Sequence, residues 1–452
     1  HAFFSVLYHR TLNVGRVQTP TLAMLAERDA KITLFHKEKY HLLHLTLDGA
    51  EAVSEKFTDS AAAEQAAAMC KGATVTCTSV TKEQKKEQPP KFYDLTTLQR
   101  EANRLFGFTA KQTLDYAQQL YEKKLLTYPR TDSQYLTEDM GQTVQHLVSD
   151  LLGLLPFAQG LALTAEVGRV LNSKKVSDHH AIIPTAEFVK QGFAGLAESE
   201  YKLMNLVCSK LLCAVAAPHE YETVTAVFSC AGNEFTAKGK TALVPGWKEI
   251  DQRFHSTMKA DGEEEAESLN TLPELAEGQS FRVTSTVSEH FTSPPKAYTE
   301  DTLLSAMERA GAEDMPEDAE RKGLGTPATR AAILEKLVQM GFVQRKGKQL
   351  VPTKDGVNLA VVLPESLTSP ALTAEWENRL TEIAKAMQTR TSSWPKLKRR
   401  CVSWSGPILV SVQISKTCSS RNGLSSASVP GVVKTSTRVK RIFTAGTVAV
   451  SS

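Results

Sequence analysis

The sequence predicts a mixed α and β protein in which a mainly helical domain is inserted into a β domain. Alternating runs of β-branched and aromatic residues, the pattern of strands, occur in two groups that are far apart in the chain. These runs are 40–48, 73–80, 221–230, 233–243 and 280–288. The chain between the two groups has helical periodicity instead. Because strands flank the helical block on both sides, the simplest topology inserts the helices into the β domain.

The length and composition are those of a multidomain globular protein. The 452 residues are enough for about two to four domains, and 41% hydrophobic with 23% charged residues is ordinary. No run of about 18 apolar residues is present, which excludes a transmembrane helix. The first residues lack the regions of a signal peptide. The chain does not begin with Met, so we expect it to be a fragment of a longer protein.

The cysteines and the absence of common motifs exclude several classes of protein. The seven cysteines are odd in number and no pair has CxxC spacing, so neither a disulfide framework nor a zinc site is predicted. Free thiols fit a reducing cytoplasm. The sequence has no GxGxxG, HExxH or GxSxG motif and no complete metal-ligand cluster, so no metal-binding residue is predicted.

The charge balance changes near residue 386. The segment 387–452 has 11 Lys and Arg and no Asp or Glu, whereas 1–386 has a net charge of −8. So long a segment without one acid is rare in an ordinary composition. We therefore interpret this tail as the product of a reading-frame shift. The alternative is a native, basic, disordered tail, which would suit the 12 serines in 401–452.

Local signals place the elements of the first part of the chain. Residues 11–31 begin with turn-forming residues and continue as a helix, with Thr19 as its N-cap and Pro20 at its first position. An alanine-rich helix is predicted at 60–70. The charged, Pro-ended stretch 82–90 is typical of a linker at which the chain crosses between domains.

The helical block has the spacing of a helix-turn-helix at its start. Helices are predicted at 95–105 and 109–126, with Gly107 between them and Thr109 as the second N-cap. The apolar stripe of the second helix consists of Leu114, Ala117, Tyr121 and Leu125. The helical period continues in 136–170 and 196–216.

The last third of the chain predicts a unit resembling a winged helix. Residues 261–268 are interpreted as a solvated acidic loop and 321–327 as a flexible basic loop. Thr326 caps a helix that starts at Pro327. The segment 342–353 then forms two short strands, and a helix followed by a basic hairpin is a common nucleic-acid-binding shape.

TYPRTDSQYL (127–136) contains a candidate nucleophile. A tyrosine hydroxyl titrates at about 10, so Tyr128 attacks poorly at neutral pH unless charge is stabilised nearby. Arg130 lies two residues further on and could hold a phosphate oxygen. The alternative is a packed Tyr-Pro turn with Arg130 as a surface charge.

VSDHHAIIPT (176–185) contains a candidate functional histidine. His179 and His180 are adjacent, and adjacent side chains point to different faces, so ligation of one metal by both is not expected. One of them could hydrogen-bond a phosphate. The alternative is a structural histidine beside the apolar run that follows.

Two further segments offer groups that bind phosphate. In VGRVQTP (14–20), Arg16 and Gln18 would share one side of an extended stretch and could line a groove; the alternative is a solvated strand edge. GLGTPATR (323–330) lacks the GxxxxGK[ST] pattern of a Walker A loop. Its glycines and the groups at its helix start can still donate to phosphates. These groups are Thr326, Thr329 and Arg330.

Taken together and in this order, the segments resemble the type IA DNA topoisomerases, specifically the bacterial topoisomerase III branch. The resemblance runs from about residue 3 to 385. The matching segments are LNVGRVQTPTLAMLAERDAKI, LLTYPRTDSQYL, VSDHHAIIPT, PPKAYTEDTLLSAMERAG, GLGTPATRAAILEKL and LTAEWENRL.

The resemblance implies an isomerase that relaxes or decatenates DNA. Tyr128 would attack a phosphodiester of single-stranded DNA, form a 5′-phosphotyrosine and leave a 3′-hydroxyl. Arg130 would stabilise the charge that develops on the phosphate, and His179 would hydrogen-bond the same region. The groove that guides the strand would be lined by Arg16, Gln18, Thr326, Thr329 and Arg330. The covalent link conserves the energy of the broken bond, so no ATP is needed.

The resemblance also implies the architecture and the cofactor. The fold would be the toroidal core of domains II, III and IV, with the Tyr-bearing domain inserted into a β arch. The expected parts are 1–35 and 293–386 (domain IV, the second part winged-helix-like), 36–88 and 218–292 (domain II), 89–217 (domain III) and the tail 387–452. Mg²⁺ would be held by an N-terminal Toprim domain that this chain lacks, so we expect no relaxation of DNA by the chain alone. The alternative function is a non-catalytic remnant that binds single-stranded DNA.

The partners implied are single-stranded and negatively supercoiled DNA, with no membrane. The resemblance further implies a monomer in the bacterial cytoplasm, associated with the nucleoid. Because 1–386 is acidic overall, affinity for DNA would come from a local basic groove. A zinc ribbon is common at the C-terminus of the family, and 428–450 read two bases later can encode its CxxC and second cysteine pair.

Overall fold

The computed structural model describes residues 14–258, 271–310, 323–370 and 372–373. The chain divides into two compact units: a central unit, 36–294, and a terminal unit formed by the chain before and after it. The predicted acidic loop at 261–268, the first residues of the predicted loop at 321–327 and the tail 387–452 lie outside the described residues.

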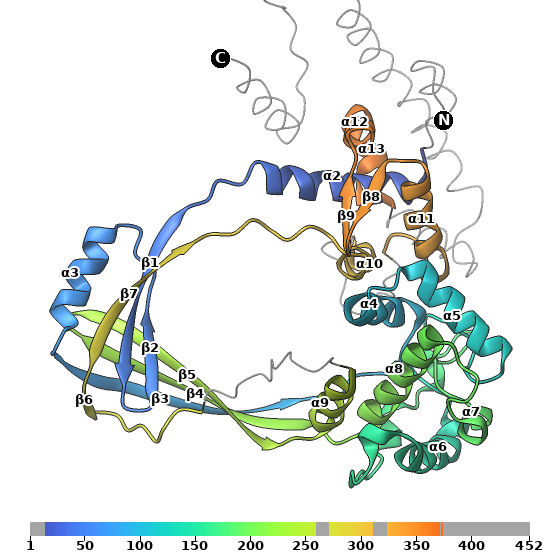
Figure 1. Cartoon of the computed structure of the whole chain (residues 1–452), viewed down its shortest axis with the longest axis horizontal. Coiled ribbons are helices and arrows are strands. Elements are labelled where there is room, and N and C mark those ends of the chain that lie inside the picture. Colours follow the sequence, from blue (N-terminus) through green and yellow to red (C-terminus); the bar gives the residue numbers. More distant parts are fainter. Residues whose placement is uncertain (1–13, 259–270, 311–322, 371, 374–452) are drawn as a thin grey trace, which may run out of the picture. The chain divides into compact units, whose positions relative to one another are not determined.

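The central unit contains a seven-stranded antiparallel sheet (Figure 1). Its strands are β1 (Lys39–Leu47), β2 (Ala50–Ser54), β3 (Thr74–Glu87), β4 (His219–Cys230), β5 (Asn233–Val244), β6 (Ser280–Arg282) and β7 (Thr284–Phe291). Their order is β6-β3-β4-β5-β2-β1-β7, so strands from before and after the helical block pair within one sheet. This confirms the predicted insertion of a helical domain into a β domain.

One face of the sheet carries its apolar core. Leu43 and Leu45 of β1 and Phe228 of β4 are fully buried there, together with Ala63 and Ala66 of α3 (Ser60–Cys70). Alternate residues of a strand point to opposite faces, and α3 covers the apolar one. The helix predicted at 60–70 is therefore confirmed, and its small alanines allow it to lie close to the strands.

The linker predicted at 82–90 is wrong over most of its length. β3 continues to Glu87 and pairs with β4 from Lys82, opposite Val224, to Glu87, opposite His219. The charged side chains of this stretch are mostly exposed, so a solvated strand accommodates them. Pairing with β4 overrides a composition that is unfavourable for strands.

The helical block contains α4 (Leu95–Phe106), α5 (Ala110–Glu122), α6 (Gly141–Leu154), α7 (Ala186–Gln191) and α8 (Glu198–Val215), followed after β5 by α9 (Trp247–Met258). The helical structure predicted from the period of 136–170 is wrong beyond Leu154. Only short 3₁₀ turns follow, η2 (Pro156–Ala158), η3 (Val167–Val170) and η4 (Ser173–Lys175), with η1 (Glu138–Met140) before α6. Pro156 explains the end, because a residue that precedes proline avoids the helical conformation.

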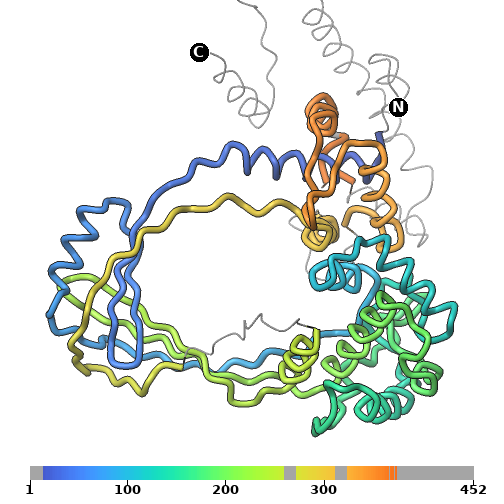
Figure 2. The backbone as a smooth tube through the Cα atoms, in the orientation of Figure 1, coloured from blue at the N-terminus to red at the C-terminus, as the bar shows by residue number. Residues whose placement is uncertain are grey.

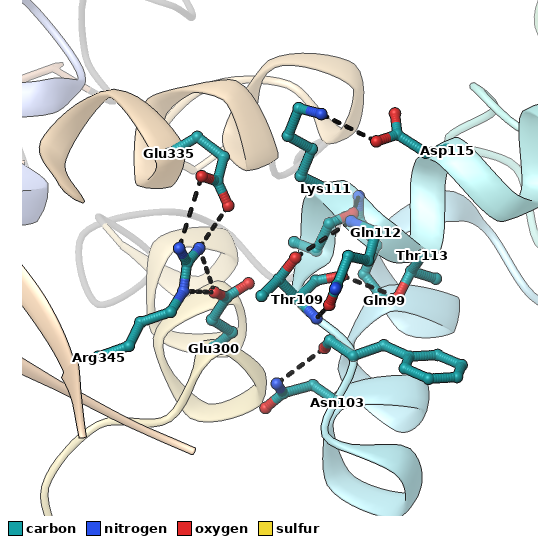
Figure 3. Close-up of polar contacts among 12 residues, drawn as sticks. Gln99, Asn103, Thr109, Lys111, Gln112, Thr113, Asp115, Glu300, Glu335 and Arg345 are labelled. Atoms are coloured by element: carbon teal, nitrogen blue, oxygen red, sulfur yellow. Dashed lines mark hydrogen bonds and ion pairs between the residues drawn. The ribbon is translucent and has the colours of Figure 1, made fainter. Parts of the chain in front are cut away.

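The predicted turn between α4 and α5 is confirmed, and side chains hold it (Figure 3). Gly107 ends α4 with a φ of 71°, in the left-handed region that glycine favours. Asn103 Nδ2 donates to the carbonyl of Phe108 and Gln99 Nε2 to that of Ala110, both at 2.9 Å. Thr109 is the N-cap of α5, as predicted. Its hydroxyl accepts from the N–H of Gln112, and the Gln112 side chain accepts from the N–H of Thr109.

The terminal unit combines helices with a two-stranded hairpin. Its elements are α2 (Gln18–Thr33), α10 (Glu300–Arg309), α11 (Pro327–Gln339), β8 (Val343–Lys346), β9 (Gln349–Pro352), α12 (Lys354–Val362) and α13 (Glu365–Thr368). Figure 2 follows the backbone from α2 into β1 and from β7 into α10. α11 begins at Pro327 after Thr326, and the hairpin follows it, as predicted. No helix in the described part of the chain is long and apolar enough to cross a membrane.

Arg345 ties the elements of the terminal unit together (Figure 3). Its guanidinium, on β8, donates to Glu300 Oε1 of α10 at 2.8 Å and also bonds Glu335 of α11. The Glu300 residue is 2% exposed. One planar donor group thus bonds two carboxylates from two helices at once, which the point charge of a lysine could not do in the same geometry.

The start of α2 differs from the prediction. The helix begins at Gln18, and the backbone N–H of Thr19 already donates to Gly15 O at 2.9 Å, so Thr19 is not the N-cap. Its hydroxyl accepts from the N–H of Gly15 at 3.1 Å. The stretch from Arg16 to Gln18 is therefore a turn entering a helix and not the extended segment predicted from the sequence.

Candidate active site around Tyr128

Tyr128 lies on a short loop that follows α5. The helix ends at Glu122, and Lys124 takes a φ of 63°, a conformation that L-residues rarely adopt. The loop is then fixed against a second segment: the N–H of Thr127 donates to Ile183 O at 3.0 Å, and its hydroxyl accepts from the N–H of Ile183 at 2.9 Å. These bonds hold the backbone immediately before Tyr128 in one place.

The structure brings Tyr128 and His179 together. Their ring centroids are 4.2 Å apart, with the planes inclined by 40°. The segment that carries Tyr128 also holds the backbone of His179, because the Thr131 hydroxyl donates to His179 O at 2.9 Å. Two of the three residues predicted for catalysis, 51 positions apart in the chain, therefore form one contact.

The third predicted catalytic residue, Arg130, has an exposed side chain two residues after Tyr128. Among the described residues, none forms an ion pair or hydrogen bond with its guanidinium. A guanidinium without an internal partner is available to an external anion, and its planar set of donors matches phosphate oxygens. One short loop of the central unit therefore carries both a phenol and an exposed positive charge.

An open pocket of about 520 Å³ lies beside the tyrosine. Its lining residues are Tyr121, Glu122, Lys124, Leu126, Thr127, Tyr128, His180 and Thr185. His180, the second histidine of the motif, bonds through Nδ1 to the carbonyl of Ala181 at 2.8 Å. The two histidines thus face different surroundings, as adjacent side chains do. A space of this kind could receive part of a nucleotide next to the phenol.

Tyr121 is a site residue that the sequence reasoning missed. The sequence predicts Tyr121 on the apolar stripe of a helix, but the residue is 40% exposed. Its ring contacts that of Tyr128 edge-on, with centroids 5.4 Å apart. The buried position is taken by Leu125, which lies beyond the end of α5. The signal for its position is the end of the helix at Glu122, before Lys123 and Lys124. A helix that ends there has Tyr121 in its last turn, beside the loop that carries Tyr128.

The residues predicted to contact DNA from the terminal unit separate into exposed and buried ones. Arg16, Thr326 and Thr329 are exposed. Gln18 is 6% exposed and its amide donates to Met340 Sδ at 3.9 Å. Arg330 is 1% exposed.

Arg330 has partners inside the terminal unit. Its Nε donates to Leu324 O at 3.1 Å, and its Nη1 lies 3.7 Å from Glu308 Oε1. A fully buried guanidinium needs such partners, because burial of an unpaired charge costs on the order of several kcal/mol. The guanidinium therefore holds the loop before α11 to α10.

Two glycines shape that loop. Gly323 and Gly325 have φ values of 57° and 69°, in the left-handed region. A Cβ atom at Gly323 would collide with the carbonyl of Met307, and one at Gly325 would lie 3.3 Å from Val17 Cγ1. The loop therefore lies directly against the turn that carries Arg16. The two phosphate-binding segments predicted from the sequence meet within the terminal unit.

The described residues do not fit a metal site. No group of three or more His, Cys, Asp or Glu side chains in this part of the chain is arranged to hold a metal ion. The Mg²⁺ implied by the resemblance therefore finds no ligand set among them, and no chemical step is assigned to it.

The comparisons with known proteins agree with the fold and the motifs. Residues 2–393 match the profile of the bacterial DNA topoisomerase family. The solved structure of full-length topoisomerase I from Thermotoga maritima is similar, with a TM-score of 0.67 and 25% identity over 87% of this chain and 63% of that one. The chain belongs to the type IA DNA topoisomerase family.

Within that family the chain is similar to DNA topoisomerase 3. It is 40% identical to the protein of that name from Bacillus licheniformis and 38% identical to that from Bacillus subtilis. The matches cover 84% and 83% of this chain and 54% of each relative. The chain therefore spans about half the length of these relatives.

Proposed function

We propose that the chain is the strand-cleaving part of a topoisomerase III-like enzyme, in which Tyr128 attacks single-stranded DNA. The observation that carries the proposal is the contact between Tyr128 and His179 beside an open pocket, with an exposed Arg130 two residues after Tyr128 in the chain. A positioned nucleophile and a nearby cation are the two requirements for attack on a phosphodiester.

The reaction would be a reversible transesterification. A bond forms between Tyr128 Oη and phosphorus, and the bond from phosphorus to the 3′-oxygen breaks. The phenol proton is balanced by the proton gained at the leaving 3′-hydroxyl. Arg130 would offset the negative charge that develops on the phosphate oxygens, and His179 would donate to them. Reversal of the same step rejoins the strand, so no ATP is consumed.

The partners follow from this chemistry. We propose single-stranded and negatively supercoiled DNA as substrates, relaxation or decatenation as the outcome, and a monomer in the bacterial cytoplasm as the working form. Exposed Arg16, Thr326 and Thr329 would contact the strand in the terminal unit. For Gln18 and Arg330, which are buried, we propose support of that surface in place of direct contact.

The test is formation of a covalent adduct between protein and DNA. The chain is joined to the part of the Bacillus licheniformis relative that it does not match, and incubated with labelled single-stranded DNA. Tyr128→Phe is expected to abolish the adduct on a denaturing gel. Tyr201→Phe, which changes another partly exposed tyrosine of the central unit, is the matched control and is expected to retain it. Adducts that survive in Tyr128→Phe would refute the assignment.

A second candidate function is binding of single-stranded DNA without cleavage, through the same exposed groups, Arg130, Arg16, Thr326 and Thr329. Binding by the chain with a steep dependence on salt, but without an adduct in the joined protein, would support this alternative.

A further inference from the structure

Tyr135, a second tyrosine near the site, has two lysine ammonium groups over its ring. Lys91 Nζ and Lys175 Nζ each lie 5.0 Å from the ring centroid of Tyr135. Tyr135 is half-buried, and both lysines are exposed. Two ammonium groups therefore converge on one phenol at the surface of the central unit.

Neither lysine has an acidic partner among the described residues. Two other lysines of the unit do pair with carboxylates: Lys190 with Glu187 at 3.3 Å and Lys202 with Glu198 at 2.5 Å. In the described chain, neither Lys91 nor Lys175 forms an ion pair. Two like charges held close together without a counter-charge repel each other, and an anion bound between them would remove that cost.

The backbone of this cluster is fixed by the structure. The Ser133 hydroxyl donates to Lys175 O at 2.8 Å and accepts from the N–H of Tyr135 at 3.1 Å. Lys91 lies two residues before Tyr93, whose carbonyl accepts from the N–H of Ile182 at 2.8 Å. The three side chains therefore extend from anchored segments and not from free loops.

The cluster adjoins the segment that contacts the nucleophile. The N–H of Ala181 donates to Tyr135 O at 3.0 Å, and His179, two residues earlier, contacts Tyr128. Two residues of extended chain span about 7 Å. A strand with its phosphate at Tyr128 could therefore reach the cluster within a few nucleotides.

We propose that Lys91, Tyr135 and Lys175 form a binding subsite for a backbone phosphate of the single-stranded DNA, a few nucleotides from the phosphate that Tyr128 attacks. This inference rests on the proposed function. The two ammonium groups and the phenol hydroxyl are all donors, and a phosphate oxygen accepts from each of them. The subsite would hold the strand in register with the nucleophile and would not read sequence.

The electrostatics of Tyr135 agree with a site built for an anion. Burial alone would raise the pKa of Tyr135, but hydrogen bonding and charge attraction from Lys91, with Lys175 adding to them, lower it below its ordinary value. A phenol with a lowered pKa is a better hydrogen-bond donor than an ordinary tyrosine.

The test measures binding of the full chain to fluorescent single-stranded DNA at a series of NaCl concentrations. For single strands, each phosphate contact contributes about 0.7 to the slope of log affinity against log salt. The double variant Lys91→Gln/Lys175→Gln is expected to lose about 0.7 from the slope and several-fold in affinity at low salt. Lys91→Arg/Lys175→Arg keeps the charges and is expected to keep the slope.

Matched controls separate the subsite from general charge effects. Lys190→Gln/Lys202→Gln removes two lysines of the same unit that pair with carboxylates, and is expected to leave the slope unchanged. If the Lys91/Lys175 variant keeps the wild-type slope while the wild type binds DNA, the subsite is refuted and the proposed function stands. If the wild type does not bind single-stranded DNA at all, both are refuted.

Discussion

Tyr128 is positioned by ring contacts as well as by its backbone. The rings of His179 and Tyr121 both contact its ring, at 4.2 Å and 5.4 Å between centroids. Such contacts restrict the ring to few orientations. Pre-organisation of a nucleophile contributes to the rate because less motion has to be lost in the transition state.

Removal of the Tyr121 ring is expected to slow cleavage. An edge-on aromatic pair is worth about 0.5–1.5 kcal/mol, so Tyr121→Ala should lower the rate of adduct formation in the joined protein about two- to tenfold. Tyr121→Phe keeps the ring and should behave as wild type. The rates are measured in single turnover with saturating DNA, so that weaker binding does not contribute. Equal rates for all three proteins would show that the contact has no role in positioning.

Arg330 is expected to act through stability. Arg330→Met leaves the buried carbonyl of Leu324 without its donor, which should lower the free energy of unfolding by about 1–3 kcal/mol. Arg16→Gln, on the exposed turn, should weaken binding of single-stranded DNA and leave stability unchanged. Urea denaturation and DNA titration of both variants check this. The reverse pattern would place the Arg330 side chain on DNA.

The sequence predicts which residues belong to the site better than it predicts which of their side chains are exposed. The family resemblance carried by the TYPRTD and SDHHAII motifs implies that Tyr128 and His179 act at the same phosphate, and the structure places their rings in contact. Gln18 and Tyr121 were placed wrongly for the same reason. Each lies within a turn of a helix end, and a shift of the end by one to four residues turns a side chain to another face.

At the scale of elements, the helical block is held by a partly buried polar network between α4 and α8. Glu101 Oε2 lies 2.8 Å from Lys210 Nζ and accepts from the Tyr93 hydroxyl at 2.5 Å, while Oε1 accepts from Arg104 at 3.1 Å. Burial alone would raise the pKa of Glu101, but these partners together hold it below its ordinary value of 4.5. The ionised carboxylate therefore stabilises the folded state.

This network predicts a loss of stability in acid. A carboxyl whose pKa is lowered by folding stabilises the fold above its unfolded pKa, and this stabilisation is lost as the pH falls from about 5 through the folded pKa. Glu101→Gln is expected to lower stability at pH 7 and to flatten the dependence on pH below about 5. Glu187→Gln changes an exposed carboxylate and should not flatten it. Urea midpoints from pH 3 to 7 give the measurement, and parallel curves for wild type and Glu101→Gln would contradict the prediction.

The elements that local signals define were predicted well, and those that distant pairing defines were not. α3, α4, α8 and α11 have caps or periodicity that can be read from neighbouring residues. The extension of β3 through Lys82–Glu87 depends on β4, which lies more than a hundred residues away in the chain. No local pattern in this charged stretch identifies its partner.

At the scale of the whole molecule, the sheet explains how the chain forms its central unit. β1 lies between β2, its neighbour in sequence, and β7, which comes after the entire helical block. Alternation alone predicted that the chain enters the β domain twice, but it does not give this order. The order matters because β1 and β7 are the strands through which the central unit connects to α2 and α10.

The central claim is that Tyr128 becomes joined to DNA. The most direct measurement is to trap the adduct formed by the joined protein, digest it with trypsin and nuclease, and locate the nucleotide by mass spectrometry. Cleavage after Lys124 and Arg130 releases 125–130, LLTYPR, in which Tyr128 is the sole tyrosine. We predict a 5′-phosphonucleotide on this peptide. A nucleotide on any other peptide, or a joined protein that binds DNA but yields no linked peptide, would contradict the account.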